Sequence, residues 1–164
     1  MTIYGDIIVL IRNPIVISCF FTYIIIQLLK VATYSYKEKK LHLVSFFETG
    51  GMPSSHSGIV TALTISLFLY DGVSSLFVVS CVFSAIVIRD SYGVRKSVGD
   101  QSLTINQLIQ LINSKMKSKK QQSTKQKATN TLNLVQVIRG HTVLQVSVGI
   151  IIGIAVPAII YFLF

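Results

Sequence analysis

Uncharged apolar runs long enough to cross a lipid bilayer dominate this sequence and restrict what it can fold into. The first run covers residues 14–29 and closes at Lys30, and residues 31–34 can extend it to full spanning length. The composition agrees, because 51% hydrophobic and 13% charged residues lie outside the usual range for a soluble domain. We therefore expect an all-α, polytopic membrane protein.

Further apolar runs bring the expected number of transmembrane helices to about four. They cover residues 54–70, 72–88 and 142–164, and Asp71 is the obvious break between the first two. The run at 54–70 is short, so its start is expected below the lipid surface in a water-accessible pocket. The predicted fold is one helical bundle, in which residues 1–164 form a single integral membrane domain.

Basic residues fall almost entirely on one side of this arrangement. Of the 15 Lys and Arg residues, Arg12 lies on the side of the N-terminus, and the other 14 belong to the opposite side. Because cytoplasmic loops of membrane proteins carry an excess of Lys and Arg, the two large loops are predicted to be cytoplasmic. We expect an integral protein of the plasma or inner membrane with both termini outside.

The stretch at residues 114–129 is polar, basic and low in complexity, and it is predicted to be a flexible cytoplasmic loop. Its lysines suit topology determination and contact with anionic lipid headgroups. A nucleic-acid partner is not expected, because no aromatic residues are interleaved with the charges as single-strand binding requires. Before this loop, residues 101–112 have the apolar spacing of an amphipathic helix that lies against the bundle or the membrane surface.

The segment GGMPSSHSG at residues 50–58 introduces the second apolar run and has the features of a loop that opens onto a helix. Its first two glycines permit a tight turn, Pro53 cannot continue a preceding helix, and Ser54 or Ser55 is a good N-cap. His56 is then expected in the first helical turn. A helix start with free amide N–H groups and a positive dipole end is suited to hold a phosphate group.

A second histidine marks the start of the last apolar run. A glycine breaks the chain before His141, and Thr142 can cap the helix that follows. Gln145 lies one turn beyond His141, so its carbonyl can accept the Nδ1 proton and leave Nε2 free as a nucleophile. Further along the run, Gly149 and Gly153 suit close contact with a neighbouring helix.

Charged residues are predicted on the same side as these two histidines. Arg95 is a candidate phosphate clamp, because a guanidinium can bind two phosphate oxygens at once. Lys30 can supply a second cation, since a charge at the inner end of a span is costly unless it meets a partner or an anion. Asp90 can orient a histidine or pair with Arg89 or Arg95, and the cations can instead reach towards lipid headgroups.

The sequence resembles the divergent PAP2 family of small membrane proteins in three segments: GGMPSSHS at 50–57, DSYGVR at 90–95 and GHTVLQVSVGIIIG at 140–153. That family is described as related to acid phosphatases and vanadium haloperoxidases. The likeness implies that His56 matches the general-acid histidine of the broader superfamily and that His141 matches its nucleophilic histidine. Gln145 replaces the aspartate of the second motif. Val135 occupies the usual place of an arginine, and Arg139 is the nearest basic residue.

The leading hypothesis is a membrane lipid-phosphate phosphatase that cleaves a phosphoric monoester or a diphosphate at the cytoplasmic face. His141 would attack phosphorus and His56 would protonate the leaving oxygen. The phosphoryl oxygens would be held by cations and by residues of the helix start: Lys30, Arg95, Ser54 and Ser55. No metal or other cofactor is expected.

The alternative hypothesis is a phospholipid- or anion-binding membrane protein, or a transporter component, that does not turn over a substrate. The neutral side chain of Gln145 favours it, because an amide stabilises an imidazolium less than a carboxylate does. Vanadate-dependent oxidation ranks third. The expected partners are a phosphorylated lipid or an anionic phospholipid, and the membrane itself.

Overall fold

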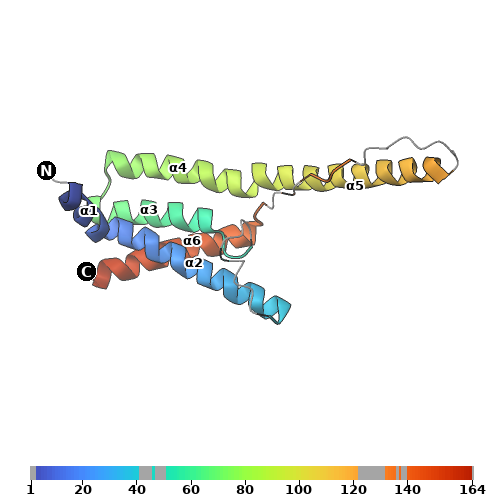
Figure 1. Ribbon diagram of the computed structural model, residues 1–164. Coiled ribbons are helices and arrows are strands. Elements are labelled where there is room, and N and C mark those ends of the chain that lie inside the picture. Colours follow the sequence, from blue (N-terminus) through green and yellow to red (C-terminus); the bar gives the residue numbers. More distant parts are fainter. Residues whose placement is uncertain are drawn as a thin grey trace.

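Six α-helices account for most of the chain. The computed structural model describes residues 3–40, 46, 51–121, 132–135, 137 and 140–163, and these contain no β-strand. In chain order the helices are α1 (Ile3–Arg12), α2 (Pro14–Glu38), α3 (Ser55–Asp71), α4 (Ser75–Tyr92), α5 (Val94–Gln121) and α6 (Val143–Leu163). The all-α fold class is therefore confirmed (Figure 1).

Three helical segments are long and apolar enough to cross a membrane. They are α2, α6 and the stretch Ser75–Met116, which joins α4 to most of α5. With 17 residues, α3 is shorter than these segments. The expected number of about four transmembrane helices is thus an approximation to three clear spans and one shorter helix beside them.

The short helix α3 lies at the centre of the bundle, where it packs against α2, α4 and α6. Its contact with α6 is close because both helices carry glycine there. Gly149 lies against Ser54 and Ser57, and Gly153 lies against Gly58 and Ala62. This confirms the close helix contact that the sequence predicted, since small residues let two helix backbones approach each other in a membrane protein.

Polar side chains cap the starts of α2 and α3, and the cap of α3 falls at one of the two serines that the sequence predicts. Ser54 caps α3 by accepting the N–H of Ser57, and Asn13 caps α2 by accepting the N–H of Ile15 at 2.9 Å. Pro14 then occupies the first position of α2, where its missing N–H has no helical partner to lose. These caps fix where α2 and α3 start.

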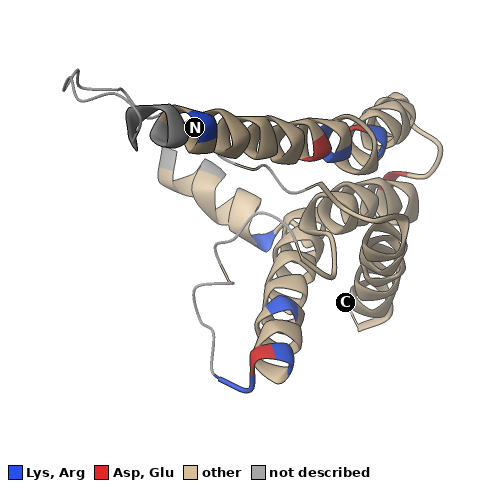
Figure 2. Cartoon of the chain, turned by 90° about the vertical axis from the view of Figure 1, so that its right-hand side faces the viewer, with Lys and Arg blue, Asp and Glu red and all other residues tan. Residues whose placement is uncertain are grey.

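Four helix ends that carry the predicted site residues gather at one end of the bundle (Figure 1). They are the C-terminal half of α2, the starts of α3 and α6, and the junction between α4 and α5. Among the residues that the structure describes, the charged ones lie mainly on the C-terminal half of α2 and on the arm that α4 and α5 form (Figure 2). The helix α6 itself contains no charged residue.

The helix α5 extends the line of α4 beyond the bundle and contacts only α4 among the described helices (Figure 1). The returning segment 132–135 lies along it and is held by two asparagine side chains. Asn106 bonds both the N–H and the C=O of Val135, at 2.7 and 2.9 Å. Asn113 bonds the N–H and the C=O of Leu132 in the same way, at 3.1 and 3.0 Å.

The basic stretch at 114–129 differs from the predicted flexible loop in its first half. The helix α5 continues to Gln121, so residues 114–121 are helical. The reason is local, because this stretch contains Lys, Met and Gln, which are good helix formers, and neither Gly nor Pro. Residues 122–129 lie outside the described residues. The amphipathic helix expected at 101–112 is part of α5.

Candidate functional site

Backbone hydrogen bonds tie three helix ends together around the two histidines. The N–H of Ser54, just before α3, donates to the carbonyl of Gln145 in α6 at 3.0 Å. The N–H of His141, just before α6, donates to the carbonyl of Ser91 in α4 at 3.1 Å. The hydroxyl of Ser57 lies within bonding distance of the carbonyls of Ser54 and Val146, at 3.1 and 3.2 Å. The frame of the site is therefore built from three helices.

His56 and His141 face each other within this frame. Their ring centroids are 6.1 Å apart, and the ring planes are inclined by 59°. His141 is buried, with 3% of its surface exposed, and His56 is half-buried. The Nδ1 atom of His56 is buried and has no hydrogen-bond partner among the residues that the structure describes. The two motifs are thus brought together although 85 positions, the difference between 141 and 56, separate their histidines.

Gln145 orients His141 and also caps its own helix. Its Oε1 atom lies 3.2 Å from Nδ1 of His141 and accepts the N–H of Thr142 at 3.1 Å. Its backbone N–H in turn donates to the hydroxyl of Thr142 at 3.4 Å, which completes a capping box. Because Oε1 already serves as an acceptor, Nδ1 of His141 must carry the proton. The other ring nitrogen, Nε2, then holds the lone pair that a nucleophile needs.

Lys30 brings a positive charge into the interior beside the start of α3. Only 1% of its surface is exposed, and its Nζ atom donates to the hydroxyl of Ser55 at 3.3 Å. No carboxylate lies within ion-pair distance of it in the described part of the chain, where Arg95 and Asp90 form the one ion pair. A buried charge without an opposite charge is costly, so this position favours an anion.

Ser54 and Ser55 have different roles at the helix start. Ser54 is fully buried. Its hydroxyl accepts the N–H of Ser57, and its own N–H donates to the carbonyl of Gln145. The hydroxyl of Ser55 accepts a hydrogen bond from the ammonium group of Lys30. The first turn of a helix also leaves backbone N–H groups without helical partners, and in α3 these include the N–H groups of Ser55 and His56. Of the two predicted phosphate-binding serines, Ser55 therefore has the free donors.

Asp90 pairs with Arg95 across the junction between α4 and α5. The Nε atom of Arg95 donates to Oδ2 of Asp90 at 2.9 Å, and each side chain is 42% exposed. Asp90 thus orients the guanidinium, which is one of the two roles that the sequence allowed it. Gly140 lies directly against the backbone of Arg95 and Lys96. This contact keeps Arg95 beside the chain segment that carries His141.

The charges of Lys30 and Arg95 act on both imidazoles. Burial lowers the pKa of His141 below its usual value of 6.5, and the two cations lower it further. Hydrogen bonds to the Gln145 side chain and to the Gly51 backbone act in the opposite direction but do not reverse the shift. His141 is therefore neutral near physiological pH, as a nucleophile must be.

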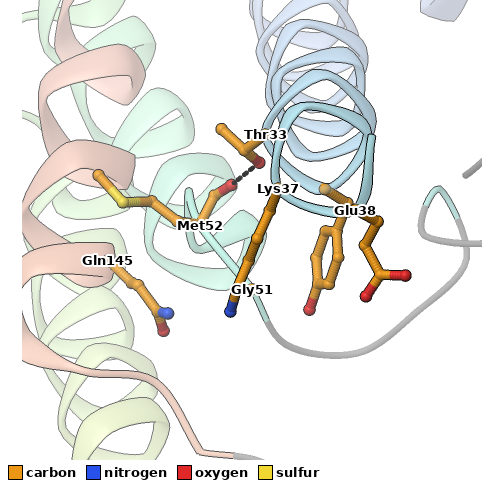
Figure 3. Close-up of a pocket in the computed structure, with 7 residues that line it drawn as sticks. Thr33, Lys37, Glu38, Gly51, Met52 and Gln145 are labelled. Atoms are coloured by element: carbon orange, nitrogen blue, oxygen red, sulfur yellow. Dashed lines mark hydrogen bonds between the residues drawn. The ribbon is translucent and has the colours of Figure 1, made fainter. Parts of the chain in front are cut away.

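The structure also brings in residues that the sequence motifs do not single out. A pocket of about 400 Å³ opens beside Gln145, and its walls include Thr33 and Lys37 from α2 and Gly51 and Met52 from the loop before α3 (Figure 3). The only sequence signal for Lys37 is its position seven residues after Lys30, on the same face of a helix. Ser91 left no such signal, because it acts through its backbone carbonyl. Arg139 lies outside the described residues.

Comparisons with known proteins cover the whole site. The sequence model of the divergent PAP2 family matches residues 11–156. An uncharacterized membrane protein of Bacillus subtilis (strain 168), YuiD, is 33% identical over 156 residues, which make up 94% of this chain and 98% of the relative. No solved structure matches the chain. With its apolar helices and a matched region that contains both histidine motifs, this integral membrane protein belongs to the divergent PAP2 family.

Proposed function

We propose that this protein is a membrane phosphatase that hydrolyses a phosphorylated lipid through a phosphohistidine. The observation that carries the proposal is the buried ammonium group of Lys30, which bonds Ser55 next to two facing histidines. A phosphoryl group supplies the negative charge that this position favours. Lys30, Arg95 and the N–H groups at the start of α3 then bind its oxygens.

The proposed reaction has two steps. Nε2 of His141 attacks phosphorus, the bond from phosphorus to the lipid oxygen breaks, and His56 gives its proton to that oxygen. Water then attacks the phosphohistidine and gives a proton to His56, and the N–P bond breaks to release phosphate and restore both histidines. Lys30 and Arg95 stabilise the charge that builds up on the phosphoryl oxygens in each step.

Gln145 is expected to make this phosphatase slower than one with an aspartate at the same place. The amide fixes the tautomer of His141, but it carries no negative charge to stabilise the imidazole as positive charge develops on it. The same feature favours a second candidate function, in which the site binds a phospholipid headgroup or another anion without turnover. Both functions use Lys30 and the start of α3.

We place the site at the cytoplasmic face of the plasma or inner membrane. The support is the charge distribution, because 14 of the 15 Lys and Arg residues belong to the predicted loops on the side of the site. A lipid phosphate in the inner leaflet would reach this end of the bundle with its chain still among the apolar helices. Anionic phospholipid is the corresponding ligand for the second candidate function.

Phosphate release by the detergent-purified protein separates the two candidates. The substrates are a panel of lipid phosphates, and the variants are His141→Ala and His56→Ala. His42→Ala removes the third histidine of the chain, which belongs to neither motif, and is expected to keep the wild-type rate. Release that disappears in the two site variants, while they stay monodisperse, supports the phosphatase. Absence of release from every substrate, with phospholipid binding retained in both variants, overturns it in favour of anion binding.

A further inference from the structure

The pocket beside Gln145 adjoins the histidine site and is large enough for a phosphate-sized group. Its volume is about 400 Å³, and it lies between the C-terminal part of α2, the loop before α3 and the first turn of α6 (Figure 3). The hydroxyl of Thr33 donates to the carbonyl of Met52 at 3.1 Å, which joins α2 to the loop in the pocket wall. The proposed chemistry at His141 does not use this space.

Lys37, the second lysine of α2, lines this pocket. It lies seven residues after Lys30, which places it on the same helix face and about 10 Å further along the axis. Its ammonium group is turned towards Gln145, whereas the carboxylate of Glu38, which also lines the pocket, lies on the side away from Gln145 (Figure 3). Within the described residues Lys37 forms no ion pair. Its charge is therefore available to a ligand.

Gln145 links the pocket to the nucleophile. Its Oε1 atom is used by His141 and Thr142, while its Nε2 atom bonds none of the residues that the structure describes. The amide group is turned towards the same space as the ammonium group of Lys37 (Figure 3). One side chain thus orients His141 with its oxygen and presents a hydrogen-bond donor to the pocket with its nitrogen.

We infer that this pocket binds a second anionic group of the substrate, next to the phosphoryl group that His141 attacks, and that Lys37 and Nε2 of Gln145 are its donors. The inference rests on the proposed function, because it assigns another group of the same substrate. It also explains why a neutral amide, and not a carboxylate, stands at position 145. A carboxylate at this position would orient His141 equally well, but it would repel an anion in the pocket and offer it no donor.

Binding of two small anions tests the inference without requiring turnover. Inorganic pyrophosphate carries two neighbouring phosphoryl groups and inorganic phosphate carries one, so the ratio of their dissociation constants reports the second subsite. We expect the wild-type protein to bind pyrophosphate at least about tenfold more tightly than phosphate. Lys37→Gln and Gln145→Glu should each reduce that ratio several-fold. Lys40→Gln, at an exposed position two residues after the end of α2, is the control and should keep the wild-type ratio.

Comparing this titration with the phosphate-release assay separates this inference from the proposed function. A pyrophosphate preference that depends on Lys37, in a protein that releases no phosphate from any lipid, would leave the second subsite standing and remove the phosphatase. Phosphate release from a lipid, together with the same pyrophosphate preference in wild type and Lys37→Gln, would support the phosphatase and remove the second subsite. A ratio near one in the wild-type protein would overturn the inference directly.

Discussion

The side-chain carbonyl of Gln145 lies 3.2 Å from Nδ1 of His141, one helical turn away. Because the same oxygen also accepts the N–H of Thr142, it cannot turn away without breaking the cap of α6. The tautomer of His141 is therefore fixed by the helix start itself.

The pH dependence of phosphate release should report the lowered pKa of His141. In the proposed reaction the neutral imidazole is the nucleophile, so activity should be lost as the pH falls through the pKa of His141 in the folded protein. That pKa lies below 6.5 because of burial and the charges of Lys30 and Arg95. The acidic limb of kcat/KM is therefore expected below pH 6.5. An acidic limb above that value, measured on the wild-type protein, would contradict the assignment of His141.

Replacing Gln145 with glutamate should move this limb towards higher pH. The carboxylate can accept the same two N–H groups, and its negative charge stabilises the imidazolium form, so the pKa of His141 rises. Turnover of a lipid monophosphate should increase by about tenfold above the limb, since the charge also stabilises the transition state. Gln145→Leu, which keeps a side chain of similar size but removes the acceptor, is the control and should lower turnover without the shift.

Lys30 should be needed for function but not for stability. Its ammonium group is buried next to a hydroxyl and has no carboxylate partner among the described residues. Replacing it with methionine removes a buried charge while keeping an unbranched side chain that is one heavy atom shorter, so the thermal midpoint should stay equal or rise. Phosphate release should fall at least about 100-fold. Lys40→Met is the control, and a large loss of stability in Lys30→Met alone would show that Lys30 supports the fold instead.

Local sequence signals predict the starts of α3 and α6 and the contact between Gln145 and His141. Ser54 and Thr142 cap their helices through hydrogen bonds to residues three positions further along the chain. The side chain of Gln145 contacts that of His141, four positions before it. Such pairs depend only on helical geometry, so they are visible in the order of the residues. The same is true of the close contact at Gly153, because small residues mark where helices in a membrane protein meet.

Contacts between distant segments could not be predicted in this way. The bond from the N–H of His141 to the carbonyl of Ser91 and the pocket shared by Lys37 and Gln145 depend on how the helices are placed relative to one another. A backbone carbonyl leaves no trace in the side-chain pattern. The helical first half of the basic stretch was missed for another reason, since its low complexity suggested a loop while its Lys, Met and Gln residues favour a helix.

The contact between α3 and α6 should tolerate no added volume at Gly153. A side chain there would meet the backbone of Gly58 and Ala62. Gly153→Val is expected to destabilise the protein by about 1–3 kcal/mol, because overpacking forces the helices apart. Ala155→Val adds two methyl groups at an exposed position of the same helix and should have little effect. Thermal unfolding of the two variants in detergent makes the comparison, and equal midpoints would contradict the packing described for Gly153.

Hydrogen exchange should reveal how the segment that leads to His141 is held on α5. Asn106 accepts the N–H of Val135 at 2.7 Å, and Asn113 accepts the N–H of Leu132 at 3.1 Å. In Asn106→Ala the amide of Val135 loses its acceptor, so its exchange should be about fivefold faster, which corresponds to about 1 kcal/mol. The amide of Leu132 keeps its partner and should change much less.

Asn113→Ala should give the opposite pattern, with faster exchange at Leu132 and a smaller change at Val135. Gln107→Ala, at an exposed position of α5, controls for the loss of a polar side chain from the helix. If each asparagine holds its own residue, the two amides respond independently of each other. Equal acceleration of both amides in either variant would instead mean that the segment detaches from α5 as one unit, and unchanged exchange in both would contradict the paired hydrogen bonds.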